Sequence, residues 1–177
     1  MSHLFYIGGS RHGKGLFAAK HIDKGSIILT YEGSLISMAQ ALEKGEKSLY
    51  PLQVYRNLYL DIGEPGVLVN HSCEPNSGIR SDVFLVALRD IEQNEEIVMD
   101  YSTTMSENLE TMNCNCGTDS CRHIIGDFHD LPEDLKCQYL ILGVVQSFIV
   151  QEHLGYLGNE EKTSNLRLQE DSRSGSP

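Results

Sequence analysis

The sequence predicts a mainly β fold, a β-rich α+β domain built from several small sheets with a helix near its C-terminal end. Two observations lead to this prediction. Short runs of β-branched, aromatic and aliphatic residues recur along the first two thirds of the chain, separated by turns rich in glycine and asparagine. After residue 130, apolar residues instead recur three or four positions apart, which is typical of a helix. The chain has 177 residues, enough for one such domain with an appendage.

The predicted strands are short and share side chains that favour extended backbone. In chain order they are Leu4–Ile7, Leu16–Ala19, Ser26–Tyr31, Tyr59–Ile62, Val67–Val69, Val83–Leu88 and Glu96–Tyr101. A short helix is predicted over Met38–Leu42, because Ser37 can cap its first turn and Gly45 follows it closely.

The residues after 130 predict a single helix of about 20 residues. It begins near Pro132, and acidic residues follow in the first turn, where the helix dipole favours them. Its apolar face could pack on the domain, bind a partner or form a homodimer. We therefore expect a main domain over residues 1–112, a cysteine-rich segment over 113–130, the helix over 131–158 and a disordered tail over 159–177.

The formal net charge is −11, and the excess is concentrated in residues 89–136, which hold 12 acids and 3 bases. This balance argues against direct nucleic acid binding, which requires a basic face. A solvated acidic surface is the simplest interpretation of such a run, and a surface for a basic partner is the alternative.

The five cysteines are unevenly placed, at Cys73, Cys114, Cys116, Cys121 and Cys137. An odd, clustered set fits a secreted disulfide framework poorly. The N-terminal residues lack a signal peptide pattern, and the longest apolar run, Tyr139–Val145, is too short to span a membrane. We expect an intracellular protein of the cytoplasm or nucleus, neither secreted nor membrane-spanning.

Three of these cysteines lie within eight residues and indicate a metal site. The thiolates of Cys114, Cys116 and Cys121 can surround one tetrahedral zinc ion, and Gly117 permits the tight turn. A fourth ligand is needed. The candidates are nearby His123 and His129 and the distant Cys73 and Cys137, and spacing alone does not choose among them.

Further candidate functional residues lie in a polar segment, a glycine loop and two strand ends. The segment Asn70–Asn76 (Asn-His-Ser-Cys-Glu-Pro-Asn) lies between two apolar runs, an arrangement that often forms a binding loop. The glycines of Gly13–Gly15 allow the backbone to approach a ligand closely. Tyr31 and Tyr101 each end a predicted strand, where a tyrosine is most often a core residue.

Taken together, these segments resemble the SET-domain protein lysine methyltransferases, in a compact form without a pre-SET region. The matching segments occur in the order of that family. They are Gly13–Ala18, Tyr31–Gly33, Asn70–Asn76, Asn94–Tyr101 and the post-SET cluster Cys114–Arg122. The resemblance implies a SET fold of small sheets with a knot-like threading of the Asn70 segment. It also identifies residues 1–112 as the SET domain and 113–130 as the post-SET segment.

The resemblance further implies an enzyme that uses S-adenosylmethionine to methylate a lysine of a basic protein, such as a histone tail. Its cofactor would be bound by Lys14, Gly15, Leu16, Asn70, His71 and Tyr101. Tyr101 and Tyr31 would be the catalytic tyrosines of the lysine channel. One structural zinc would be bound by Cys73, Cys114, Cys116 and Cys121. The chain departs from the family pattern at Leu68 and Val69, where an Arg-Phe pair is common, and at His123, where a glycine is common.

One expectation about the partner follows. The acidic residues 89–136 would border the substrate groove and steer a basic peptide into it. Two other functions fit part of the pattern: a catalytically silent SET-like module that binds basic peptides, and a zinc-stabilised interaction domain. The second leaves the Asn70–Asn76 segment unexplained.

Overall fold

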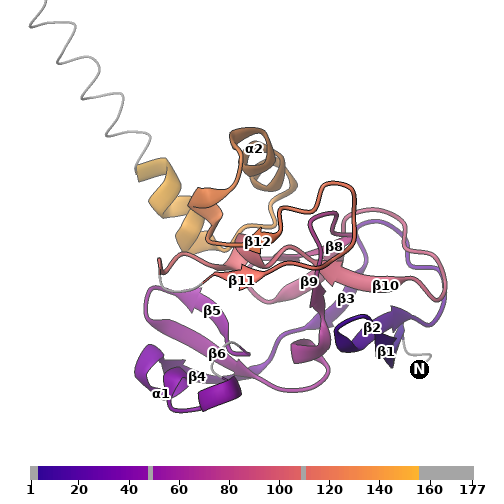
Figure 1. Ribbon diagram of the computed structural model, residues 1–177, viewed down its shortest axis with the longest axis horizontal. Coiled ribbons are helices and arrows are strands. Elements are labelled where there is room, and N and C mark those ends of the chain that lie inside the picture. Colours follow the sequence, from indigo (N-terminus) through magenta and orange to yellow (C-terminus); the bar gives the residue numbers. More distant parts are fainter. Residues whose placement is uncertain (1–3, 48–49, 109–110, 156–177) are drawn as a thin grey trace, which may run out of the picture.

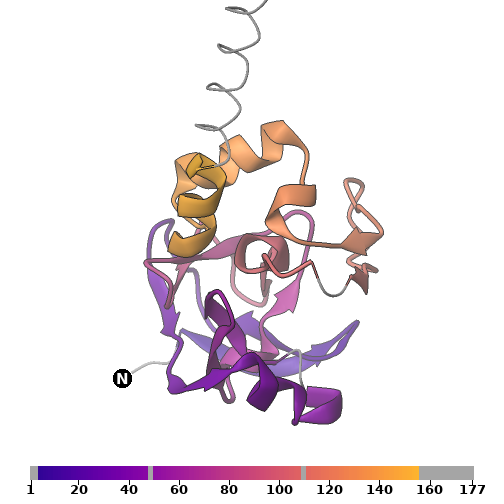
Figure 2. The same cartoon turned by 90° about the vertical axis from the view of Figure 1, so that its left-hand side faces the viewer.

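The computed structural model describes residues 4–47, 50–108 and 111–155. Within these ranges the chain forms three small sheets and a two-stranded ribbon, which confirms the predicted β-rich fold. The C-terminal helices cover one end of the molecule, and a layer of β4, β5, β6 and α1 forms the opposite end (Figures 1 and 2). No described helix is long and apolar enough to cross a membrane.

The first sheet brings the glycine loop and the Asn-His segment together. Its strand order is β1-β2-β10-β7, with β1 Phe5–Ser10, β2 Gly13–Ala18, β10 Glu96–Met99 and β7 Asn70–His71. The hairpin β1–β2 pairs antiparallel, and β2 continues antiparallel to β10. Strand β7 then pairs parallel to β10, with Asn70 opposite Val98 and His71 opposite Met99. The sheet therefore places Asn70 and His71 beside the strand that leads to Tyr101.

The other two sheets complete the core. One has the order β3-β9-β8, with β3 Ile27–Thr30, β9 Phe84–Ala87 and β8 Ser77–Arg80. The other has the order β4-β6-β5, with β4 Gly33–Ser37, β6 Leu58–Ile62 and β5 Leu52–Tyr55. Buried side chains from all three sheets form one apolar cluster, which includes Leu16, Ile79, Leu85 and Ile97. The predicted helix α1 Met38–Leu42 is present, with Ser37 forming a capping box with Gln40.

The strand predicted over Val67–Val69 is wrong, because the residues Gly66–Leu68 form a 3-10 turn, η2. The amide of Leu68 donates to the carbonyl of Pro65 at 3.0 Å, which closes the turn. Further 3-10 turns are η1 Gly45–Lys47, η3 Tyr101–Thr104 and η4 Phe128–Asp130, and the ribbon pairs β11 Met112–Asn113 with β12 Ile124–Ile125. Tyr101 thus begins a turn rather than ending a strand.

The single helix predicted over 131–158 is also wrong. Helix α2 covers Glu133–Leu142 and ends at Gly143, whose φ of 66° is the left-handed conformation that terminates helices. A second helix covers residues 147–155 in the described part of the chain. The apolar periodicity continues across the break because both helices bury side chains in one cluster with Val86 and Phe128. Cys137, on α2, is exposed. The predicted tail 159–177 lies outside the described residues.

Candidate active site

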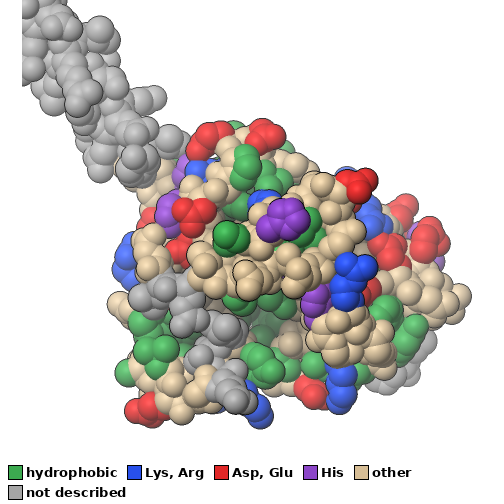
Figure 3. Space-filling model, in the orientation of Figure 1, with side chains coloured by type: hydrophobic (Ala, Val, Ile, Leu, Met, Phe, Trp, Pro, Cys, Tyr) green, Lys and Arg blue, Asp and Glu red, His purple; other side chains and the backbone are tan. Residues whose placement is uncertain are grey.

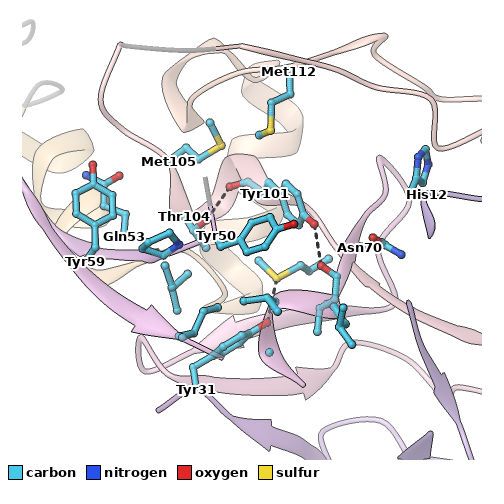
Figure 4. A pocket seen from close by; sticks show the side chains of 18 of the residues that line it. His12, Tyr31, Tyr50, Gln53, Tyr59, Asn70, Tyr101, Thr104, Met105 and Met112 are labelled. Carbon is cyan, nitrogen blue, oxygen red and sulfur yellow. Dashed lines mark hydrogen bonds between the residues drawn. The ribbon is translucent and has the colours of Figure 1, made fainter. Parts of the chain in front are cut away.

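A cavity of about 550 Å³ lies between the layer of β4–β6 and the segment that follows β10. Hydrophobic side chains border its opening on the face shown in Figure 3. Figure 4 shows that His12 and Asn70 lie at one side, Gln53 and Tyr59 at the other, and Tyr31, Tyr50 and Tyr101 between them. The aromatic and apolar lining residues also include Leu52, Leu68, Val69, Met99, Met105 and Met112.

The middle of the cavity has a wall of tyrosines, two of which are the predicted catalytic residues. The hydroxyl of Tyr101 donates to the carbonyl of Val69 at 2.8 Å. The hydroxyl of Tyr31 points to Met99 Sδ at 3.6 Å. Burial raises the pKa of Tyr101 to about 12, and the nearby Glu96 carboxylate adds to the rise. Burial likewise raises the pKa of Tyr31 well above its usual range. Both phenols therefore remain neutral at physiological pH.

The predicted cofactor residues surround the other side of the cavity. The Asn70 amide donates to the carbonyl of Lys14 at 3.1 Å and to Glu96 Oε1 at 2.7 Å. Gly15 lies against this pair, since a Cβ there would collide with Glu96 Oε1 and lie 2.9 Å from Asn70 Nδ2. Lys14 and Asn70 line the cavity, whereas the side chain of Leu16 is fully buried in the core.

His71 lies beneath Tyr101 and links it to the cysteine cluster. Its Nδ1 accepts the Tyr101 backbone N–H at 3.3 Å, and the two rings meet edge to face. Its Nε2 is 3.5 Å from Cys73 Sγ. Burial lowers the pKa of His71 to about 4, against the opposing influence of the Asp100 carboxylate. The imidazole is therefore neutral, which allows Nδ1 to act as the acceptor.

The structure brings Cys73 to the three clustered cysteines, and the four sulfurs lie within 4.8 Å of one another. Cys114 Sγ lies 3.7 Å from Cys73 Sγ and 3.6 Å from Cys121 Sγ. Zinc–sulfur bonds of about 2.3 Å in a tetrahedron place sulfurs about 3.8 Å apart, so these distances fit one zinc ion. Of the other candidates, Cys137 lies outside the group and His129 pairs with Asp130 at 3.1 Å. His123 Nδ1 is 3.9 Å from Cys121 Sγ, beside a set that is already complete.

A buried ionic cluster joins the post-SET segment, the strand end before Tyr101 and helix α2. The Asp100 carboxylate accepts two hydrogen bonds from Arg122, at 2.7 and 2.8 Å, and one from the Tyr139 hydroxyl at 2.9 Å. The Ser102 amide donates to the same carboxylate at 3.1 Å. Hydrogen bonding to Asp100 raises the pKa of Arg122 despite its burial. The sequence did not identify Tyr139 as a partner of Asp100, because its helical spacing is the same as that of an ordinary core residue.

Most of the described acids of residues 89–136 do not line the cavity, and the expectation of an acidic rim for a basic peptide stays a prediction. Among the described residues that line the cavity, Glu107 is the one acidic residue from this stretch. Several others form internal pairs or caps, such as Glu95 with Arg89, Asp100 with Arg122 and Glu133 with Lys136. On the face shown in Figure 3, acidic side chains are scattered over the periphery.

Comparison with known proteins agrees with this geometry. The SET domain family model matches residues 13–102, a span that holds the glycine loop, the Asn-His segment and Tyr101. The chain belongs to the SET-domain family. This match confirms the resemblance drawn from the motifs. The knot-like threading that the family implies stays a prediction for this SET domain.

Among curated proteins, this SET domain is 31% identical over 137 residues to histone-lysine N-methyltransferase trithorax of Drosophila virilis, covering 66% of this chain and 4% of that protein. It is 30% identical over 131 residues to human histone-lysine N-methyltransferase 2B, covering 64% of this chain and 5% of that protein. The chain thus spans a small fraction of these relatives.

Among solved structures, the methyltransferase domain of human histone-lysine N-methyltransferase SETMAR has the same fold. The TM-score is 0.57 at 24% identity, over 72% of this chain and 59% of that chain. An autoinhibited ctPRC2 bound to S-adenosylmethionine matches with a TM-score of 0.52 at 22% identity, over 60% of this chain and 16% of that chain.

Proposed function

We propose that this SET domain transfers a methyl group from S-adenosylmethionine to a lysine side chain of a protein. The observation that carries the proposal is the cavity itself. Its neutral tyrosine wall continues to Lys14 and Asn70, which the family pattern assigns to the cofactor. The relatives named as histone-lysine methyltransferases support a histone tail or another basic protein as substrate. We infer action inside the cell, in the nucleus or the cytoplasm.

The residues around Gly15 fit a cofactor with a polar amino acid portion. The absence of a side chain at Gly15 lets the Asn70 amide and the Glu96 carboxylate lie close to the loop backbone. Lys14 and Asn70 supply polar groups to the lining of the cavity. We assign cofactor binding to these residues together with His71, Tyr101 and the backbone of Leu16. S-adenosylmethionine, when bound, supplies a methyl group on a positively charged sulfur.

The protein's contribution to the reaction is to desolvate and orient the lysine side chain and to favour its uncharged amine over the ammonium form. A lysine ammonium has a pKa of about 10.4, so its deprotonation at pH 7 costs about 4–5 kcal/mol in water. An apolar channel lowers that pKa because it disfavours the charged form. Tyr31 and Tyr101 line this channel, and their protonated hydroxyls can orient the amine nitrogen. A phenol with a raised pKa is unsuited to act as the base, so positioning is the role we assign to Tyr101.

We also propose one structural zinc ion bound by Cys73, Cys114, Cys116 and Cys121. Their sulfur distances fit a tetrahedral set, and the residues come from both sides of the site. Cys73 directly follows the His71–Ser72 segment, whereas the other three lie in the post-SET segment. The ion would hold the post-SET segment against the strand that carries the Asn-His pair.

The decisive experiment is methyl transfer from labelled S-adenosylmethionine to a panel of basic proteins, including histones. We expect transfer by the parent chain and a loss of about 10²–10³-fold in kcat for Tyr101→Phe, the range seen when one positioned donor is removed. Binding of S-adenosylmethionine, measured by calorimetry, should remain detectable in both, because Tyr101→Phe alters only one of the proposed cofactor-binding residues. Cofactor binding without transfer to any protein would instead support a silent module. Absence of both would favour a zinc-stabilised interaction domain.

A further inference from the structure

The residue Glu152 connects three segments that are far apart in the sequence. It lies on the helix 147–155, well beyond the part of the chain that matches the family model. Its Oε1 accepts a hydrogen bond from Arg56 Nε at 2.9 Å and forms an ion pair with Arg56 Nη2 at 2.7 Å. Its Oε2 accepts a hydrogen bond from the Ser106 hydroxyl at 2.9 Å. One carboxylate is therefore shared between two different segments.

Both of these segments belong to the wall of the cavity. Arg56 lies in the turn between β5 and β6, the strands that contribute Gln53 and Tyr59 to the lining. Ser106 lies between Met105 and Glu107, which line the cavity as well. Figure 4 shows Gln53 and Tyr59 at the side away from Asn70. Glu152 therefore contacts the two segments that form the side of the cavity away from the cofactor residues.

The two segments that Glu152 contacts also meet each other directly, through one hydrogen bond. The backbone N–H of Ser106 donates to the side-chain oxygen of Gln53 at 3.1 Å, and Gln53 is buried. Glu152 holds the hydroxyl of the same Ser106 and, through Arg56, the turn after Gln53. The Gln53–Ser106 contact thus lies between the two points that Glu152 fixes.

The helix that carries Glu152 is itself firmly placed. The side chain of Asp82, in the turn between β8 and β9, accepts the Ser147 amide at 2.7 Å at the start of this helix. Phe148 and Ile149 are buried in the cluster with Val86. A side chain presented from such an element has few alternative positions, which suits it to fix the geometry of its partners.

We propose that Glu152 is a positioning residue that sets the spacing of the cavity wall on the lysine-binding side. The inference rests on the proposed function, because it assigns the wall to substrate binding. The ion pair is partly exposed, with side-chain exposures of 63% for Arg56 and 32% for Glu152. Such pairs add little to stability. Loss of the Arg56–Glu152 pair should therefore change the geometry of the cavity wall more than the stability of the fold.

The test compares Glu152→Gln with the parent in steady-state methyl transfer to a basic peptide that the parent methylates. We expect the KM for the peptide to rise between about threefold and thirtyfold, which lies within the range of coupling between contacting side chains. The KM for S-adenosylmethionine and the kcat should change less than about twofold, because the cofactor side is untouched. Arg56→Gln should reproduce the change. The matched control is Glu133→Gln, which removes an ion pair with Lys136 in the same C-terminal part but touches no lining residue.

A second measurement does not depend on activity. Hydrogen exchange at the Ser106 amide should accelerate in Glu152→Gln and stay unchanged in Glu133→Gln. Equal exchange in the parent and Glu152→Gln overturns the proposal, as does an unchanged peptide KM in an active enzyme. If the parent transfers no methyl group, the proposed function fails, and the exchange rates still decide whether Glu152 holds the wall.

Discussion

Replacing Tyr139 with phenylalanine tests the buried ionic cluster with the smallest possible change. The substitution keeps the ring in its buried position and removes only the hydroxyl that donates to Asp100 Oδ2 at 2.9 Å. The Asp100 side chain is 0% exposed, so no bulk water can replace the lost donor. The carboxylate keeps Arg122 and the Ser102 amide, and the cluster loses one donor of several.

The magnitude follows from the type of hydrogen bond. A hydrogen bond to a charged group contributes about 1.5–3 kcal/mol, so the free energy of unfolding should fall by that amount. For a chain of this size, each kcal/mol shifts Tm by about 2–4 °C, which gives a decrease of roughly 3–12 °C. Arg122→Gln should cost more, about 3–5 kcal/mol, because it leaves a buried carboxylate without its cationic partner.

The assay is thermal and urea unfolding at a fixed zinc concentration, followed by circular dichroism. Tyr6→Phe is the matched control, since the Tyr6 hydroxyl also donates to a side-chain oxygen, that of Asn94 at 3.1 Å, but on an exposed face. It should change the free energy of unfolding by less than about 0.5 kcal/mol. Equal shifts for Tyr139→Phe and Tyr6→Phe would refute the reasoning that burial makes the Asp100 cluster energetically important.

Three further predictions concern the site. Gly15→Ala should weaken S-adenosylmethionine binding at least about tenfold in calorimetry, because the added Cβ meets Asn70 and Glu96; equal affinity would contradict the assignment of this loop. Cys73→Ser should reduce the measured zinc content from one ion per chain and lower Tm, whereas Cys137→Ser, at an exposed position, should change neither. Stability should fall as pH rises through 10, because the unfolded tyrosines ionise there while burial keeps Tyr31, Tyr101 and Tyr139 protonated in the folded state. A triple tyrosine-to-phenylalanine variant that keeps the same alkaline slope in urea titrations would exclude these groups as its source.

The family was predictable from the sequence, and so were most residues of the candidate site. The Asn70–Asn76 segment, the glycine loop, Tyr101 and the cysteine cluster each depend on residue types at short spacings, and local sequence specifies these directly. The short strands were also largely predictable, because side-chain alternation and turn residues act within a few positions. The glycine that ends α2 could be read from the sequence as well. The apolar residues on both sides of it have the same period, however, so the two helices were predicted as one.

The tertiary structure decided every feature that depends on residues distant in the chain. It placed Cys73 beside Cys114, 41 positions away, and so selected the fourth sulfur of the cluster. It paired several acids of the acidic run with basic side chains of the same chain. It also turned the C-terminal part back so that Tyr139 reaches Asp100 and Glu152 reaches Ser106. The physical reason is that a side chain's type can be read from the sequence, whereas its partners are set by how the strands and helices pack, and that packing minimises the free energy of the whole core at once.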